Sequence, residues 1–178
     1  MKFKVFRFKK IKSTNNTAIR LIKKTNFKNG MVTTHQQTNG KGQYGRKWIS
    51  FRGNLFVSFF FKLENLTISI KKLTKINCFL VKKLLSLYYR NKIIYKKPND
   101  LLIDKKKICG ILQETVNKLD EKYLVVGIGI NLKKNPKLIG YPTTNLKELI
   151  GQDLSKKSIE IKLKNIFEQG LKDIYKKN

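Results

Sequence analysis

The sequence predicts an α+β protein with a mixed, largely antiparallel sheet and helices packed on one side of it. Two observations support this class. Strand-like segments in the second half of the chain are separated by short polar turns, which is the pattern of β-hairpins. Segments with apolar residues at helical spacing stand between groups of strands rather than after every strand, which is typical of α+β proteins.

The first elements are a strand, a helix and a second strand. Alternating Phe and Val residues predict a strand over residues 2–9. The side chain of Ser13 can accept a hydrogen bond from the free N–H groups of a first helical turn, so we expect a helix over residues 14–25. β-branched residues then predict a strand over residues 31–36.

A glycine-containing segment follows and leads into the most apolar part of the chain. Residues 37–47 hold three glycines and show no periodicity, which predicts a loop. Residues 54–62 are strongly apolar and predict a strand. Helical spacing of apolar residues predicts a helix over residues 67–90, and a short strand follows at residues 93–96.

The remaining elements are three strands and two helices. Polar turns at residues 104–106 and 117–121 predict that the three strands form hairpins. The strands are predicted at residues 101–104, 108–116 and 123–130. The helices are predicted at residues 144–150 and 155–175.

Length and composition indicate one folded domain. The chain has 178 residues, 40% of them hydrophobic, which is enough for a core of its own. No apolar run approaches the roughly 20 residues that cross a bilayer, and the charged N-terminus lacks the apolar centre of a secretory signal. Cys78 and Cys109 form no CxxC pair. We therefore expect a cytoplasmic protein with no membrane partner.

The net charge of +29 raises the question of nucleic-acid binding. Only 5 of the 40 basic residues are Arg, although Arg is the residue that groove-reading proteins favour. The Lys residues are spread over the whole chain, and Lys, Asn and Ile are all abundant while Ala occurs once, as expected of an AT-rich coding sequence. We expect a solvated lysine surface and no specific nucleic-acid partner. A basic nucleic-acid-binding module without activity is kept as an alternative.

The segment Gly40-Lys-Gly-Gln-Tyr-Gly45 has the spacing of a dinucleotide-binding fingerprint. That motif requires a helix directly after it, whose N-terminus receives the phosphates. Here the chain continues through Trp48 into a predicted strand, so the fingerprint interpretation fails. The segment is either a basic loop whose glycines let the backbone approach an anion, or an ordinary hairpin loop with solvated lysines.

The sequence gives little indication of a His/Cys metal site or of a Ser-His-acid catalytic triad. His35 is the only histidine and the two cysteines are distant in sequence, so no His/Cys metal site is predicted. A Ser-His-acid triad would depend on that same histidine.

Lys107 is one of three consecutive lysines. If Ile108 points into the core, alternation along the strand directs Lys107 to the opposite face.

Several short motifs follow one another along the chain. They are residues 13–15, Gln37, residues 40–46, Trp48, and residues 96–100, 107–114 and 127–131. This series resembles the catalytic domain of biotin–protein ligases. In order, that family has Ser-Thr-Asn at its first helix, a Gln before a loop rich in Gly and Arg, a Trp, a Lys-Trp-Pro-Asn-Asp, a Lys-x-x-Gly-Ile-Leu-x-Glu and a Gly-Ile-Gly-x-Asn. Residues 142–146 also resemble a family segment before a late helix. The resemblance therefore covers nearly the whole chain.

The resemblance implies a class II synthetase-like biotin/lipoate ligase fold and a reaction in two steps. Biotin and ATP would form biotinyl-5′-AMP and pyrophosphate. Biotin would then pass to a lysine of a biotin carboxyl carrier protein, the acceptor domain of a carboxylase such as acetyl-CoA carboxylase. ATP, Mg²⁺ and biotin would be needed, with no tightly bound cofactor and no metal held by protein ligands. A homodimer is compatible with the resemblance.

Three sets of site residues follow from the resemblance. Cations are expected among them because they offset the repulsion between a carboxylate and the phosphate that it attacks. The catalytic set comprises Lys107, Lys41 and Arg46. The biotin-binding set comprises Ser13, Thr14, Asn15, Gln37, Lys41, Gly42, Gln43, Lys107 and Gly110. The nucleotide-binding set comprises Trp48, Asn99, Asp100 and Asn131.

The chain departs from the family pattern at several positions. Lys41 stands where the family usually has Arg, and Lys97 replaces the usual Trp before Pro98. Gln43 occupies a position that the family uses to retain the activated intermediate, where a basic residue is common. We expect a single catalytic domain over residues 1–178, with neither an N-terminal winged helix nor a C-terminal SH3-like barrel.

A lipoate–protein ligase of the same fold is the alternative enzyme. The polar side chains of Ser13, Thr14, Asn15 and Gln37 suit the ureido ring of biotin. The dithiolane of lipoate requires an apolar pocket instead. Biotin is therefore the expected substrate.

Overall fold

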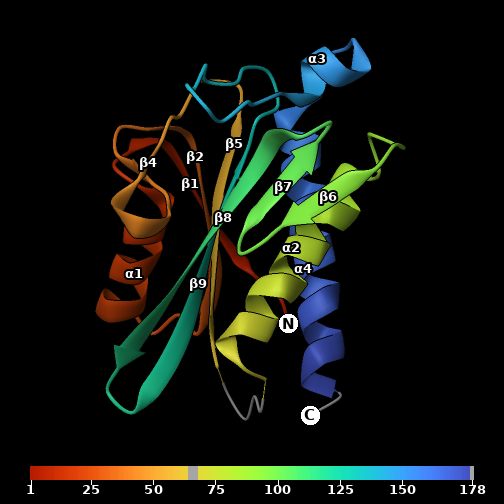
Figure 1. Ribbon diagram of the computed structural model, residues 1–178. Coiled ribbons are helices and arrows are strands. Elements are labelled where there is room, and N and C mark those ends of the chain that lie inside the picture. The colour runs from red at the N-terminus through yellow and green to blue at the C-terminus, as the bar shows by residue number, and fades with distance from the viewer. Residues whose placement is uncertain (64–67, 177–178) are drawn as a thin grey trace.

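The computed structural model describes residues 1–63 and 68–176, which are built around a seven-stranded sheet (Figure 1). The strands lie in the order β1-β2-β5-β9-β8-β7-β6. They are β1 (Lys4–Ile11), β2 (Asn29–Gln37), β5 (Leu55–Lys62), β6 (Ile93–Lys96), β7 (Asp100–Ile103), β8 (Lys106–Lys118) and β9 (Glu121–Ile130). β1 and β2 run parallel, and every other neighbouring pair is antiparallel. The prediction of a mixed, largely antiparallel sheet is confirmed.

Helices cover both faces of this sheet. The described residues contain α1 (Thr14–Lys24), α2 (Ile70–Leu85), α3 (Leu146–Ile150) and α4 (Lys156–Lys176). α1 packs on β2, β5 and β9 from one side, while α2 and α4 pack on each other on the opposite side (Figure 1). The α+β class is confirmed, but the expectation that the helices lie on one side of the sheet is wrong.

β5 shows why both faces must be covered. Successive side chains of a strand point to opposite faces. Phe59 and Phe61 of β5 belong to the larger core under α2 and α4, whereas Phe60 belongs to the smaller core under α1. The ring of Phe59 stacks on that of Phe167 in α4, with centroids 4.2 Å apart. A strand that is apolar at nearly every position is stable only between two layers.

The predicted helices are present, with shifted ends. The hydroxyl of Ser13 accepts a hydrogen bond from the Asn16 N–H at 3.4 Å and caps α1 as expected. The helix predicted over residues 67–90 begins at Ile70 and ends at Leu85; residue 67 lies outside the described residues. Leu87, which contributed to the predicted apolar face, lies in a turn beyond the helix and is 58% exposed.

Residues 37–47 form more regular structure than the predicted loop. β3 (Gly40–Lys41) pairs with β4 (Lys47–Trp48), and a single 3-10 turn joins them. The Gly42 N–H donates to the Arg46 carbonyl at 2.7 Å and closes this turn. We call residues 40–48 the glycine hairpin. The hairpin is held by local backbone hydrogen bonds and not by a buried apolar face, so hydrophobic periodicity could not predict it.

No helix among the described residues combines the length and the apolar character that crossing a membrane requires.

Candidate active site

A cavity of about 490 Å³ opens beside the sheet and brings the predicted site residues together. Its lining comes from the start of α1, the glycine hairpin, the turn before β7, the strands β8 and β9, and the segment after β9. All fourteen predicted residues line it, namely Ser13, Thr14, Asn15, Gln37, Lys41, Gly42, Gln43, Arg46, Trp48, Asn99, Asp100, Lys107, Gly110 and Asn131. These residues lie up to 118 positions apart in the sequence, so it is the fold that brings them together.

One end of the cavity is polar and partly organised by Gln37. The Gln37 Oε1 accepts hydrogen bonds from both the backbone N–H and the hydroxyl of Thr14, at 2.8 and 3.1 Å. Its Nε2 donates to the Ser50 hydroxyl at 3.1 Å. The side chain of Gln37 is therefore fixed against the first turn of α1, and Thr14 and Gln37 form one rigid polar unit.

Asn15 extends this polar end toward the sheet. Its Nδ2 donates to a carboxylate oxygen of Glu114 at 2.7 Å, and its Oδ1 accepts from the Ser58 hydroxyl. A side chain at Gly127 would place its Cβ 2.2 Å from the Asn15 Oδ1. Glycine is thus required at position 127 for Asn15 to reach this place, which gives that glycine a packing reason.

Trp48 forms an aromatic wall over the glycine floor of the cavity. Gly110 of β8 and Gly129 of β9 face each other in the sheet. A Cβ on Gly129 would lie 2.4 Å from the indole ring of Trp48, and one on Gly110 would lie 2.7 Å from it. Within the described residues, the buried indole N–H of Trp48 has no hydrogen-bond partner.

Lys107 lies at the centre of the cavity's charged part. Its Nζ is 2.8 Å from the Asp100 Oδ1, and the two side chains are only 20% and 12% exposed. The Nζ also lies 5.4 Å from the centroid of the Trp48 ring. The predicted alternation holds, because Ile108 is fully buried in the larger core while Lys107 faces the cavity. Lys105 and Lys106, by contrast, are exposed.

Tyr141 is a lining residue that the sequence analysis missed. Its hydroxyl donates to the Asp100 Oδ2 at 2.6 Å, and the Lys107 Nζ lies 5.5 Å from its ring centroid. Partial burial, together with the hydrogen bond to Asp100, raises the pKa of Tyr141 above its ordinary value, so the phenol stays a neutral donor. An aromatic residue directly before the motif at residues 142–146 was the one available signal.

Backbone hydrogen bonds tie the segment that carries Tyr141 to β8. The Lys107 N–H donates to the Pro142 carbonyl at 2.8 Å, and the Thr144 N–H donates to the Lys107 carbonyl at 3.0 Å. Asn131 supports the same segment, since its Nδ2 donates to the Thr144 carbonyl at 3.1 Å. The position of Tyr141 is thereby coupled to that of Lys107.

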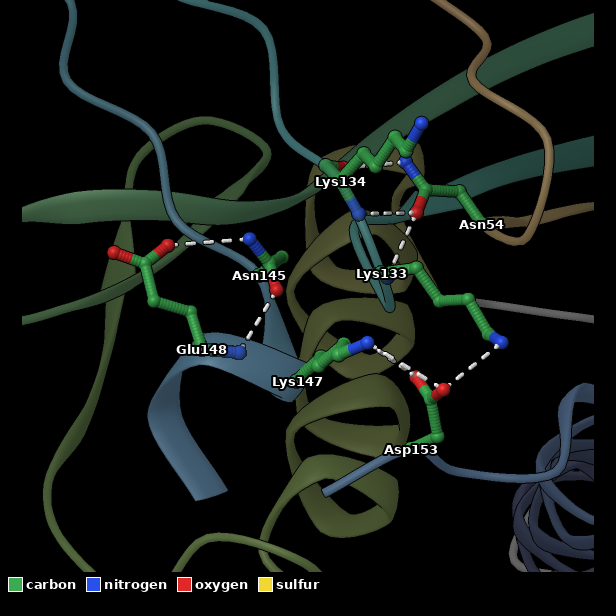
Figure 2. Close-up of polar contacts among 7 residues, drawn as sticks. All are labelled: Asn54, Lys133, Lys134, Asn145, Lys147, Glu148 and Asp153. Atoms are coloured by element: carbon green, nitrogen blue, oxygen red, sulfur yellow. Dashed lines mark hydrogen bonds and ion pairs between the residues drawn. The ribbon is translucent and has the colours of Figure 1, made fainter. Parts of the chain in front are cut away.

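Asn54 holds the turn that follows β9 (Figure 2). Its Oδ1 accepts hydrogen bonds from three consecutive N–H groups, those of Leu132, Lys133 and Lys134, at 3.0 to 3.2 Å. Its Nδ2 donates to the Lys134 carbonyl at 2.7 Å. Figure 2 also shows Asp153 between Lys133 and Lys147, with ion-pair distances of 3.4 and 3.5 Å. These contacts fix the chain direction just beyond Asn131.

Asn99 is held in place by backbone contacts to β8. Its Nδ2 donates to the Ile111 carbonyl at 2.7 Å, and its own carbonyl accepts from the Ile111 N–H at 3.0 Å. These bonds anchor the turn before β7, in which the Lys97–Pro98 peptide bond is cis. Asn99 lines the cavity, and one of the two N–H donors of its amide is already engaged.

The lining of the cavity is strongly cationic. The charged lining residues are one carboxylate, Asp100, and six cations, namely Lys41, Arg46, Lys47, Lys96, Lys97 and Lys107. The side chains of Lys41 and Arg46 are exposed on the glycine hairpin. No group of three or more His, Cys, Asp or Glu residues suited to a metal ion occurs in the described part of the chain. The cavity thus favours an anionic ligand.

Comparison with known proteins places this arrangement in a family. Residues 7–131 match the Biotin/lipoate A/B protein ligase family. The chain is 33% identical over 124 residues to the bifunctional ligase/repressor BirA of Escherichia coli, an alignment that covers 68% of this chain and 38% of BirA. It is 26% identical over 171 residues to BirA of Bacillus subtilis, covering 92% of this chain and 52% of that protein. The chain thus spans between about two fifths and one half of these relatives.

Solved structures agree with the sequence comparison. The biotin protein ligase of Aquifex aeolicus in complex with biotin and ATP superposes with a TM-score of 0.80 at 28% identity, covering 98% of this chain and 73% of that chain. The R40G mutant of the same ligase, in complex with biotin, gives a TM-score of 0.77 at 31% identity, covering 97% of this chain and 71% of that chain. The chain therefore has the fold of a biotin protein ligase catalytic domain, and it belongs to the biotin/lipoate A/B protein ligase family.

Proposed function

We propose that this protein activates biotin with ATP and transfers it to a lysine of a biotin carboxyl carrier protein. One observation carries the proposal: the polar unit of Thr14 and Gln37 and the cation Lys107 line one cavity. The volume of about 490 Å³ and the polar and cationic lining groups would suit an uncharged polar ring together with phosphates. The similar Aquifex aeolicus ligase was solved with biotin and ATP, which supports the same pair of ligands here.

Biotin is favoured over lipoate by the polar end of the cavity. Asn15, Thr14 and Gln37 present amide and hydroxyl groups there, and all three are held by hydrogen bonds. A ureido ring offers both N–H donors and a carbonyl acceptor, whereas a dithiolane offers neither. A site built to hydrogen-bond a substrate rejects an analogue that leaves its polar groups unpaired.

In the first step, an oxygen of the biotin carboxylate attacks the α-phosphorus of ATP. A bond forms between this oxygen and the phosphorus, and the bond to the β-phosphate oxygen breaks, which releases pyrophosphate. Both reactants are anions, so positive charge at the reacting centre lowers the barrier. We assign this role to Lys107, which lies half-buried beside Gly110, where a glycine leaves room for its ammonium group.

The glycine hairpin is proposed to complete the site during activation. Its exposed Lys41 and Arg46 border the cavity, and Gly42 and Gln43 also line it. Binding of an anionic intermediate would draw these cations inward and exclude water, which otherwise hydrolyses a mixed anhydride. Trp48, Asn99, Asp100 and Asn131 are proposed to form the nucleotide side of the cavity.

In the second step, a neutral lysine amine of the carrier attacks the acyl carbon of biotinyl-AMP. An amide bond forms, the bond between the acyl carbon and the phosphate oxygen breaks, and AMP leaves with the shared electron pair. The amine proton is passed to solvent or to a nearby base. We propose residues 1–178 as the catalytic unit for both steps.

Magnesium is proposed to arrive with the nucleotide rather than in a protein site. Among the described residues that line the cavity, Asp100 is the one carboxylate, and it already contacts Lys107 and Tyr141. This donor set does not fit a protein cage for Mg²⁺, which takes oxygen ligands and commonly binds to the phosphates of ATP. No step is therefore assigned to a protein-bound metal.

The proposal is tested by incubating the protein with biotin, ATP, Mg²⁺ and a biotin carboxyl carrier domain. Intact-mass measurement should show addition of one biotin to the carrier. A carrier whose target lysine is replaced by Arg provides the control and should stay unmodified. If the wild-type carrier gains no mass while an established ligase modifies it under the same conditions, the proposed transfer is wrong. Retention on DNA that collapses with salt, without ATP turnover, would support the nucleic-acid alternative.

A further inference from the structure

We infer that Tyr141 is a positioning residue that keeps the ammonium group of Lys107 available for substrate. It does so by orienting the Asp100 carboxylate, which then meets Lys107 as an ion pair without a well-directed hydrogen bond. The inference rests on the proposed function, because it concerns the residue assigned to the reacting centre. It goes beyond that function by giving a role to the segment after β9, on which Tyr141 lies. It is carried by the geometry of the three side chains.

The carboxylate of Asp100 is shared between two partners. Its Oδ2 receives a short hydrogen bond from the Tyr141 hydroxyl, at 2.6 Å. Its Oδ1 lies 2.8 Å from the Lys107 Nζ, yet within the described residues this oxygen has no hydrogen bond of acceptable angle. Asp100 therefore makes its well-directed bond to Tyr141, and meets Lys107 as a neighbouring charge.

This division has a consequence for Lys107. An ammonium group has three N–H donors. A carboxylate free to turn would point a lone pair at this group and take one donor in a strong, charge-assisted hydrogen bond. Because Tyr141 fixes the carboxylate by its other oxygen, the donors of Lys107 remain directed elsewhere in the cavity.

The ring of Tyr141 contributes a second constraint. The Lys107 Nζ lies 5.5 Å from the Tyr141 ring centroid and 5.4 Å from that of Trp48, and the Lys96 Nζ lies 4.5 Å from the Tyr141 ring. Ring faces attract cations without taking up an N–H donor in a fixed direction. Lys107 is thus retained in the cavity by rings and by a nearby charge, and its donors stay open to substrate oxygens.

The substitution Tyr141→Phe tests this inference because it removes the hydroxyl and keeps the ring. With its second oxygen released, Asp100 should turn toward Lys107 and bind it more strongly. The amine of Lys107 then becomes less available to an electrophile. Labelling of Lys107 by acetic anhydride, followed by peptide mass spectrometry, should fall about threefold or more relative to labelling of Lys105, as expected for gain of one hydrogen bond.

The same variant should slow activation without weakening biotin binding. We expect kcat for biotin-dependent AMP formation to fall about tenfold, and KM for biotin to stay within about twofold of the wild type. A merely structural role would lower the melting temperature and change both parameters together. Tyr89→Phe is the matched control, because the Tyr89 hydroxyl donates to Asp104 at 3.3 Å on the exposed surface, away from the cavity. It should change neither labelling nor kcat.

Asp100→Asn shows whether Tyr141 acts through the carboxylate. If it does, adding Tyr141→Phe to Asp100→Asn should change Lys107 labelling no further. Unchanged or increased labelling in Tyr141→Phe alone, or an equal effect in both backgrounds, overturns the inference. Labelling does not depend on turnover, so an inactive wild-type protein with the expected labelling pattern would refute the proposed function and leave the positioning role of Tyr141 intact.

Discussion

Replacing Lys107 by Ala should nearly abolish activation while leaving the protein folded. Lys107 is the cation closest to the glycine floor of the cavity, with its Nζ 2.8 Å from Asp100 and its side chain 20% exposed. Loss of one donor that stabilises developing charge typically costs about 3–4 kcal/mol in the transition state. That figure corresponds to a fall of roughly 100- to 1000-fold in the rate of AMP formation.

The loss of folding stability in Lys107→Ala should be too small to unfold the protein. Lys107→Ala leaves Asp100 without its cation, but the hydrogen bond from Tyr141 remains. We expect a loss of about 1–3 kcal/mol in the free energy of unfolding. For a chain of this size each kcal/mol lowers the melting temperature by about 2–4 °C. Circular dichroism during heating therefore separates a folded, inactive variant from an unfolded one.

Lys105→Ala and Lys106→Ala are the matched controls for Lys107→Ala. Both lysines are exposed in or beside the turn between β7 and β8. Their removal changes net charge by the same amount, so any loss caused by charge alone would appear in all three variants. The assay is release of AMP from labelled ATP in the presence of biotin. Equal losses in the three variants would refute the special role of Lys107.

Three further changes have defined outcomes. Gly129→Ala would place a Cβ 2.4 Å from the Trp48 ring and should displace the indole. We expect a change in the fluorescence of Trp48 and a KM for ATP raised at least severalfold; an unchanged KM would contradict the assigned nucleotide side. Gln43→Arg adds a cation to the lining and should slow escape of biotinyl-AMP by about fivefold, from roughly 1 kcal/mol of attraction in water, which is measured as reduced biotinylation of bystander proteins; equal labelling would refute it. Ser13→Ala removes the cap contact with Asn16 and should cost about 1 kcal/mol of stability, measured by urea unfolding; an unchanged midpoint would show that the cap contributes nothing.

Local signals were sufficient for much of the fold. Ser13 predicted the start of α1 because capping depends on residues within one helical turn. Alternation separated Lys107 from its two neighbours, because the direction of a strand side chain follows from its position in the strand. The motif order was enough to predict fourteen of the residues that line the cavity, although their place in the lining does not test the role of any one of them.

The features that were missed depend on contacts between distant segments. Tyr141 meets Asp100 across 41 residues of sequence. No local pattern marks such a pair, which is brought together by hydrogen bonds from Lys107 and Asn131 to the segment at 142–144. Likewise, the helices were expected on one side because strand patterns alone did not show that Phe60 requires the cover of α1.

The central claim is that the polar end of the cavity selects biotin for activation beside Lys107. The most direct measurement compares AMP formation from ATP and Mg²⁺ in parallel reactions with biotin, with lipoate and with neither acid. We predict that biotin stimulates AMP formation and that lipoate does not, with a preference on the order of 10⁴. The reason is that only the ureido ring can use the donor and acceptor capacity that Thr14, Asn15 and Gln37 retain beside their bonds within the protein. Comparable stimulation by lipoate would contradict the account.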